Sequence, residues 1–151
     1  ASATHATEQH MAETIHVDIV SAEGEIFSGE AKMVFLPAIE GDVGIAPRHA
    51  PLLTLLRAGE VRVQASDGGP AQFFYVGGGA LEVQPRMVTV LADTATRAHD
   101  LDEAAALEAR KRAEEALAGK IDRLEQAEPL AELARAAAQL KLIERLRKIR
   151  G

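Results

Sequence analysis

The sequence predicts two segregated modules, an N-terminal antiparallel β-sandwich followed by a C-terminal antiparallel α-helical hairpin. Of the 12 glycines, all but Gly119 and Gly151 precede residue 80, and glycine is typical of turns. Alanine, the best helix former, is concentrated between residues 101 and 140. The earlier part also contains short segments in which apolar and polar residues alternate. The composition therefore changes class near residue 95.

These observations divide the chain into three segments. Residues 1–10 lack periodicity and precede Met11, so we expect a disordered extension of artificial origin there. The β-sandwich is expected over residues 11–97 and the helical hairpin over residues 98–151. A length of 151 residues alone favours a single domain, so the change in composition is what predicts two modules.

The strands are predicted from residues with a period of two. Ile15, Val17 and Ile19 alternate with His16 and Asp18, which is typical of a half-buried strand. Further short strands are expected at residues 33–36, 52–57, 61–65, 72–76, 80–84 and 87–91. Turn residues separate several of them, at 58–59, 67–70 and 85–86. Many short strands at this spacing indicate an antiparallel sandwich or barrel.

The hairpin begins with a helix-capping signal. Asp102 can cap a first helix that should run to about residue 118, before the helix breaker Gly119. A second helix is expected from Pro129, because proline is tolerated at the first helical position, and it could extend to Ile149.

Apolar residues, mostly alanine with a few leucines, occur at helical spacing on one face of each expected helix. They are Ala106, Ala109, Ala113 and Ala116 in the first helix, and Leu130, Leu133, Ala134, Ala137 and Leu140 in the second. Such faces let two helices approach closely. Alanine offers little apolar area, and burial contributes roughly 25 cal/mol per Å². We therefore expect the hairpin to be held modestly and to swing away without unfolding the sandwich.

Composition excludes several classes of function. The chain has no cysteine, so disulfides and thiolate metal sites are absent, which fits a reducing compartment. Aromatic residues make up only 3% of the chain and the net charge is −6, both of which argue against nucleic-acid binding. No apolar run is long enough for a transmembrane helix, and no secretory signal is visible.

No motif predicts catalysis or a metal site. The three glycines at 77–79 are followed by a strand and lack the lysine and helix of a phosphate loop, so a bulge or a close approach between sheets is expected. The histidines do not form pairs with metal-ligand spacing. No acid, base and oxyanion donor come together in the pattern, so we expect a non-catalytic protein.

Two segments could contact partners. Residues 42–51 form a long irregular link, in which His49 is either a solvated loop residue or a contact residue. Charge is uneven, with 6 basic and 13 acidic residues in 1–100, against 11 and 10 in 101–151. The basic residues at 145–150 are either cations favoured at a helix C-terminus or a docking strip for an acidic partner. A membrane-binding strip is less favoured because bulky aromatic anchors are missing.

Several ordered blocks resemble the epsilon subunit of the bacterial F-type ATP synthase, and together they span most of residues 12–150. The matching blocks are HVDIVSAE at 16–23, FSG at 27–29, EGDVGIAPRHAPLL at 40–53, GGALEVQP at 78–85, VTVLADTA at 88–95 and AELARA at 131–136. The resemblance implies the same β-sandwich and helical hairpin. It also implies a non-catalytic rotor subunit of the central stalk, which couples the gamma subunit to the c-ring during ATP synthesis by ion translocation.

The resemblance also implies where the partners bind. Residues Glu40, Asp42, Arg48 and His49 match the region that meets the c-ring. The hairpin is implied to permit ATP hydrolysis when folded on the sandwich and to inhibit it when extended along gamma. Its basic residues then approach an acidic segment of the catalytic beta subunit, with Arg135, Lys141, Arg145 and Arg147 as the expected docking residues. The complex implies a peripheral location on the cytoplasmic face of the bacterial inner membrane.

A nucleotide-sensing role is the alternative function. Some family members bind ATP through an Ile/Leu-Asp-x-x-Arg-Ala pattern, and Leu101 and Asp102 match its first two positions. Ala105 stands where the pattern has arginine, which removes a guanidinium that could pair with phosphate. We therefore predict weak or absent ATP binding, with Glu82, Asp102 and Lys141 as residual candidates, and no other cofactor.

Overall fold

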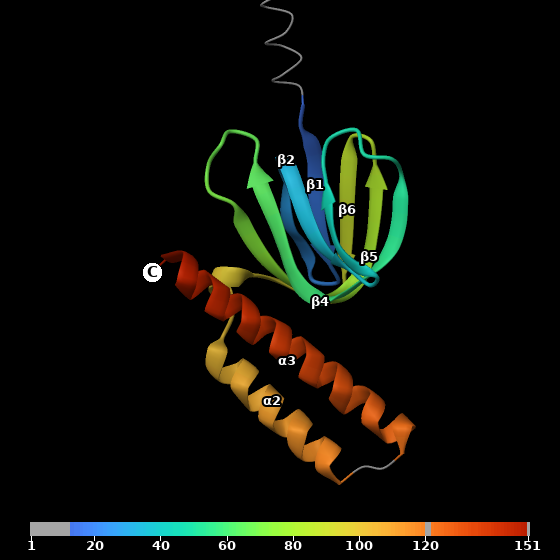
Figure 1. The fold of residues 1–151 in the computed structure, drawn as a ribbon, viewed down its shortest axis with the longest axis vertical. Coiled ribbons are helices and arrows are strands. Elements are labelled where there is room, and N and C mark those ends of the chain that lie inside the picture. The colour runs from blue at the N-terminus through green and yellow to red at the C-terminus, as the bar shows by residue number, and fades with distance from the viewer. Residues whose placement is uncertain (1–12, 120–121, 151) are drawn as a thin grey trace, which may run out of the picture.

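A computed structural model describes residues 13–119 and 122–150 (Figure 1). The extension expected at residues 1–10 lies outside the described residues. The strands are β1 (Ile15–Ser21), β2 (Gly24–Ala38), β3 (Gly41–Ile45), β4 (Leu52–Ala65), β5 (Gln72–Gln84), β6 (Met87–Ala92) and β7 (Ala95–Arg97). A short 3₁₀ helix, η1 (Ala98–Asp100), leads to the helices α2 (Glu103–Ala118) and α3 (Arg123–Arg150). The predicted sandwich followed by a helical hairpin is confirmed.

The strands form a flattened, closed sheet in the order β1-β6-β5-β4-β2-β3, and β1 also pairs with β2. Most pairs are antiparallel as expected, but β1 and β6 run parallel. The long β2 makes the closure feasible, because its first half pairs with β1 and its second half with β3 and β4. Alternate residues of β1, β4, β5 and β6 point into one apolar core, which includes Ile15, Val17, Val61, Phe74 and Val90.

Two of the expected turns and links are wrong. Residues 58–59 lie within the continuous strand β4, where Ala58 pairs with Gly77 and Gly59 with Val76. Gly59 is needed for close packing, since an added Cβ would lie 2.8 Å from Pro37. The link expected over 42–51 begins with β3, which pairs with the end of β2. Sequence alone could not show that this short segment finds a partner strand.

The glycines at 77–79 fulfil the structural role expected of them. Gly78 and Gly79 have φ angles of +98° and +138°. Here β5 changes its neighbour from β6 to β7, because Gly79 pairs with Ala92 whereas Val76 pairs with Ala95. An added Cβ on Gly79 would lie 2.8 Å from the Cα of Ala92, so the close approach requires glycine.

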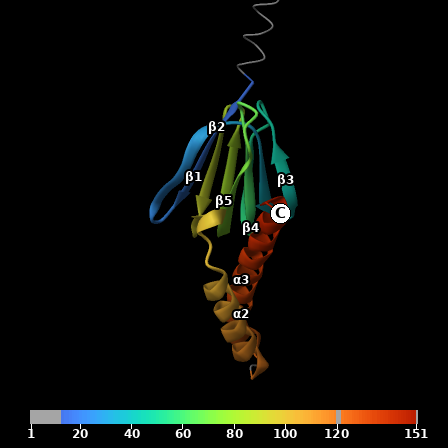
Figure 2. The ribbon, with the colours of Figure 1, turned by 90° about the vertical axis from the view of Figure 1, so that its left-hand side faces the viewer.

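The helices lie at one end of the sandwich, and the tip of the hairpin points away from it (Figures 1 and 2). Helix α2 begins and ends where predicted, with the Asp102 carboxylate accepting a hydrogen bond from the Ala105 N–H at 3.2 Å. Helix α3 begins at Arg123, earlier than predicted, and contains Pro129 within its second turn. The missed signal is Asp122, whose carboxylate accepts a hydrogen bond from the Leu124 N–H at 3.0 Å.

The apolar face expected on the second helix is partly wrong. Ala134 and Ala137 are exposed and Leu130 is 50% exposed, whereas Pro129, Ala136 and Leu142 are buried. On the first helix, Ala106 and Ala113 are buried as expected. Helix α3 contacts both α2 and the strands β4 and β5, so it buries two faces instead of one. A single amphipathic stripe could not predict this arrangement.

Candidate functional site

The contact between α3 and the sandwich is a small apolar cluster. Tyr75 of β5, Ala98 of η1 and Leu142 of α3 are buried together. Phe73 and Leu146 pack at its margin. The four consecutive apolar residues at 73–76 explain why this end of β5 can bury both faces: Phe74 and Val76 enter the core, while Phe73 and Tyr75 meet α3. This break in alternation was the available sequence signal for the docking surface.

Tyr75 is the single tyrosine of the chain. Its hydroxyl is buried without a hydrogen bond of good geometry, although Gln139, Thr94 and Arg135 lie beside it. Burial raises the pKa of the Tyr75 phenol above its ordinary value of 10.0. The residue therefore reports on whether α3 covers β5.

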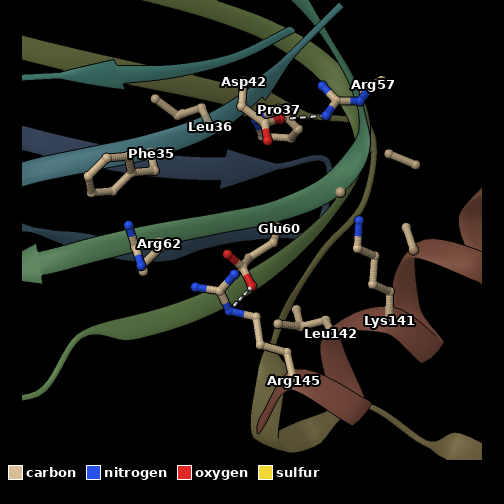
Figure 3. A pocket seen from close by; sticks show the side chains of 13 residues that line it. Phe35, Leu36, Pro37, Asp42, Arg57, Glu60, Arg62, Lys141, Leu142 and Arg145 are labelled. Carbon is tan, nitrogen blue, oxygen red and sulfur yellow. Dashed lines mark hydrogen bonds and ion pairs between the residues drawn. The ribbon is translucent and has the colours of Figure 1, made fainter. Parts of the chain in front are cut away.

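A cleft of about 360 Å³ lies next to this cluster, between α3 and strands β2, β3 and β4 (Figure 3). Six charged side chains line it: Asp42, Arg57, Glu60, Arg62, Lys141 and Arg145. Most of these charges are compensated within the chain. Arg57 pairs with Asp42 and also donates to the Ala38 carbonyl at 2.7 Å.

Glu60 and Arg145 connect the sandwich to the hairpin across this cleft. The Arg145 Nε atom lies 3.1 Å from the Glu60 carboxylate, and its guanidinium carbon lies 5.6 Å from the Phe73 ring centroid. Burial raises the pKa of the Glu60 carboxyl, and Asp42 adds to this, whereas Arg145, Arg62 and Lys141 oppose it. The cationic neighbours thus do not fully compensate the cost of burying this carboxylate.

The residues expected to dock on the beta subunit are already engaged within the chain, with one exception. Arg135 pairs with Glu128 at 2.9 Å, Arg145 with Glu60, and Arg147 with Glu103 in the first turn of α2. Lys141 is exposed at the rim of the cleft. Three of the four expected docking cations are therefore already paired within the chain when the hairpin is packed on the sandwich.

The residues expected at the c-ring do not form one cluster. Glu40 lies in the turn just before β3, and Asp42, near the start of β3, borders the cleft beside the hairpin. Arg48 and His49 follow the other end of β3, where the Arg48 N–H donates to the Pro85 carbonyl at 2.8 Å. Arg48 adopts a φ of 65°, in the left-handed region that residues other than glycine seldom occupy. A partner that touches all four residues must extend along β3.

The residual ATP candidates also lie apart. Glu82 pairs with Leu53 and Thr89 on the sheet, toward the end of β5 that is remote from the hairpin. Asp102 caps α2, and Lys141 borders the cleft. The arrangement offers no convergent nucleotide site built from these three residues, and the expectation of weak or absent ATP binding stays a prediction.

An exposed apolar strip on the outer face of the sheet was not anticipated. Cross-strand pairing puts Leu55, Ala80 and Leu91 in one row and Leu53 in the next, on the face opposite the core. Leu53 is 77% exposed, Leu55 58% and Leu91 54%. Exposed apolar residues that adjoin one another on a sheet are typical of an interaction surface.

A charged cluster borders this strip on β1 and β2. His16 lies 2.6 Å from the Glu30 carboxylate and 2.8 Å from that of Asp18, and Ser28 donates to Asp18 at 2.6 Å. The hydrogen bond to Glu30 raises the pKa of His16 most strongly, and Asp18 adds to this. In turn, His16 lowers the pKa of Glu30, while the hydroxyl of Ser28 is the main cause that lowers the pKa of Asp18. The sequence showed His16 only as an isolated histidine in a strand.

Among the described residues, no group of three or more His, Cys, Asp or Glu side chains could hold a metal ion. Within the same part of the chain, none of the helices is both long and apolar enough to cross a membrane.

Family models match almost the whole described fold. The model "ATP synthase, Delta/Epsilon chain, beta-sandwich domain" matches residues 14–98, and "ATP synthase, Delta/Epsilon chain, long alpha-helix domain" matches residues 99–144. The fold is also similar to a chain of the Euglena gracilis mitochondrial ATP synthase, with a TM-score of 0.75, 15% identity, and coverage of 85% of this chain and 81% of that one. The protein is thus a two-domain chain of the ATP synthase delta/epsilon class.

Curated relatives define the family more closely. The ATP synthase epsilon chain of Alkalilimnicola ehrlichii is 65% identical over 89% of this chain and 96% of its own length. That of Nitrosococcus oceani is 62% identical over 93% of this chain and 100% of its own length. The chain therefore belongs to the family of epsilon subunits of the F-type ATP synthase.

Proposed function

We propose that this epsilon subunit is a non-catalytic part of the rotor, in which the sandwich binds the gamma subunit and rests on the c-ring. The solved structures with this fold include one described as the central stalk and c-ring of the Tetrahymena thermophila mitochondrial ATP synthase, with a TM-score of 0.59 and 12% identity. The observation that carries most of the proposal is the exposed strip of Leu53, Leu55 and Leu91, because a sheet face of this kind needs a partner.

The gamma subunit is the proposed occupant of this strip. A rotor subunit must stay bound to its neighbours while it turns, so it needs a permanent interface. Permanent interfaces are more apolar than transient ones. The c-ring contact is proposed to follow β3, from Glu40 and Asp42 to Arg48 and His49. The protein is then peripheral to the cytoplasmic face of the bacterial inner membrane through these contacts.

The hairpin is proposed to regulate ATP hydrolysis by leaving the sandwich and docking on the catalytic beta subunit. Its contact with the sandwich is small, since Leu142 is the one residue of α3 within the buried cluster and Ala138 and Leu146 contribute only at the margin. The cations at the end of α3 suit an acidic segment of the partner, because complementary charge provides steering and specificity.

Deleting the residues after Leu101 tests the regulatory part of the proposal. The sandwich should still assemble into the complex, because its core does not include the hairpin. ATP hydrolysis by the complex should rise, since the inhibitory segment is absent. Unchanged hydrolysis in a correctly assembled complex would remove the regulatory role and leave the rotor role intact.

A further inference from the structure

We propose that Glu60 of the sandwich competes with the acidic partner of the hairpin for Arg145. Binding of Arg145 by that partner and release of α3 from the sandwich are then one coupled event. The acidic partner in this inference rests on the proposed docking of the hairpin on the beta subunit. The Glu60–Arg145 ion pair itself is present in the isolated chain.

The first argument is geometric. The Arg145 Nε atom lies 3.1 Å from the Glu60 carboxylate across the cleft (Figure 3), so an external carboxylate that pairs with the Nε edge of the guanidinium must displace Glu60. Arg145 is still accessible, because its side chain is 45% exposed. An acidic peptide can therefore approach this arginine before the helix moves.

The second argument concerns the carboxylate that would be left behind. The Glu60 side chain is only 24% exposed, compared with 60% for Glu114, which pairs with Arg110 on the surface of α2. A partly buried carboxylate without its partner is unfavourable, and burial already raises the pKa of Glu60 despite three nearby cations. Once Arg145 is captured, Glu60 favours the open state, in which water can reach it.

The third argument is the distribution of the remaining ion pairs. Arg112–Glu132 and Arg147–Glu103 join α2 to α3 and can move with the hairpin. Among the described residues, the ion pair that joins α3 to the sandwich is Glu60–Arg145. Capture of Arg145 therefore acts on the boundary that must open, while the hairpin keeps its own internal pairs.

Tyr75 allows this to be measured in the full-length chain. The chain contains one tyrosine and no tryptophan, and Tyr75 lies in the cluster with Leu142 of α3. Acrylamide quenching of tyrosine fluorescence then reports the opening of α3. Hydrogen exchange of the amides of α3 provides a second and independent readout.

The test is a double-mutant cycle with Arg145→Gln, Glu60→Gln and the two together. Arg145→Gln should increase opening about tenfold, because it removes the ion-pair partner of the partly buried Glu60 carboxylate. Glu60→Gln should stay within about twofold of the parent chain, and the double variant should return to within about threefold of Glu60→Gln. The matched control is Arg110→Gln, which removes an arginine of similar exposure, 47%, from an ion pair inside α2.

Two outcomes would overturn the inference. One is a double variant that is as open as Arg145→Gln, which would mean that lost packing of the arginine causes the opening. The other is opening by Arg145→Gln that does not exceed that of Arg110→Gln. Neither outcome depends on ATP hydrolysis by the complex, so failure here is distinguishable from failure of the deletion experiment.

The partner is tested with a synthetic glutamate-rich peptide at low ionic strength, where attraction between charges is least screened. It should increase quenching of Tyr75 in the parent chain several-fold, while a glutamine-rich peptide of the same length should not. Equal effects of the two peptides, or no effect of either, would overturn the role of an acidic partner in releasing α3.

Discussion

Leu142 of α3 lies against Tyr75 of β5, and each side chain is only 2% exposed. The two residues come from different domains, so this contact is a main attachment of the hairpin to the sandwich. Burial of one leucine is worth roughly 1.5–3 kcal/mol, which is small compared with the core of the sandwich. The hairpin should therefore separate from the sandwich before the sandwich unfolds.

Leu142→Ala is predicted to release the hairpin while the sandwich remains folded. The substitution should weaken docking by about 2–5 kcal/mol, because it removes a fully buried side chain. Hydrogen exchange should quicken in α3, and the emission of Tyr75 should become accessible to quenchers, while the amides of β1 and β6 keep their protection.

Leu130→Ala is the matched control for this prediction, since Leu130 is 50% exposed on the same helix. It should change the free energy of hairpin docking, measured by the quenching of Tyr75, by less than about 0.5 kcal/mol. If Leu142→Ala instead melted the sandwich and the hairpin together in one transition, the two domains would be a single cooperative unit and the proposed detachment of the hairpin would be untenable.

Gly79→Ala is predicted to destabilise the sandwich severely. Gly79 has a φ of +138°, and a Cβ there would collide with the carbonyl oxygen of Leu91 in the backbone of β6. Backbone strain and the steric overlap together should cost about 3 kcal/mol or more. Thermal unfolding followed by circular dichroism in the far ultraviolet measures the effect.

Gly68→Ala separates strain from steric overlap. Gly68 also has a positive φ, +80°, but nothing lies within 4 Å of its added Cβ. Its cost should be limited to about 1 kcal/mol of conformational preference. If the two substitutions lowered the free energy of unfolding equally, close packing against β6 would not explain the glycine at residue 79.

The sequence predicted the sandwich and the hairpin because their local signals agree with their tertiary structure. Asp102 and Gly119 bound α2 as expected. The start of α3 was missed because Pro129 suggested a first helical position, whereas Asp122 caps the helix earlier and the proline is tolerated within it. Likewise, Gly59 suggested a turn, but the close approach of Pro37 from β2 explains it, and that approach is long-range.

The candidate site was less predictable than the fold, for a related reason. The sequence identified Arg145 and Arg147 as basic residues but could not show that Glu60 and Glu103 compensate them. Their partners are distant in sequence and come together only when α3 folds back. The exposed strip was also hidden, because Leu55 and Leu91 become neighbours only through the pairing of β4, β5 and β6.

The cluster around His16 is predicted to make stability depend on pH. Glu30 and Asp18 raise the pKa of His16 above 6.5, so its stabilisation is complete below pH 6.5 and is lost as the pH rises through the raised value. The pKa values of Glu30 and Asp18 lie below their ordinary 4.5 and 3.8, so their stabilisation is present above those values and is lost on acidification. The contribution of the cluster should therefore be greatest between about pH 4.5 and 6.5.

Urea unfolding across this pH range measures the dependence. His16→Gln should flatten the curve above pH 6, because the group that titrates there is removed. His99→Gln is the control, since His99 is 60% exposed and lies 3.4 Å from Asp100 alone. The prediction fails if both variants leave the same dependence on pH as the parent chain.

Leu55→Asp is predicted to block assembly of the subunit with gamma without affecting its own fold. Leu55 points outward and is 58% exposed, so an aspartate there costs the isolated chain little, whereas a charge buried in an apolar interface without a partner is costly. Affinity for gamma should fall by at least about a hundredfold, which corresponds to ~2.7 kcal/mol. Leu124→Asp, on the hairpin at 86% exposure, is the control for an added charge at an exposed leucine. The affinity of each variant for purified gamma is measured by calorimetry. If Leu55→Asp and Leu124→Asp bound gamma equally well, the outer face of β4 to β6 would be excluded as the gamma contact.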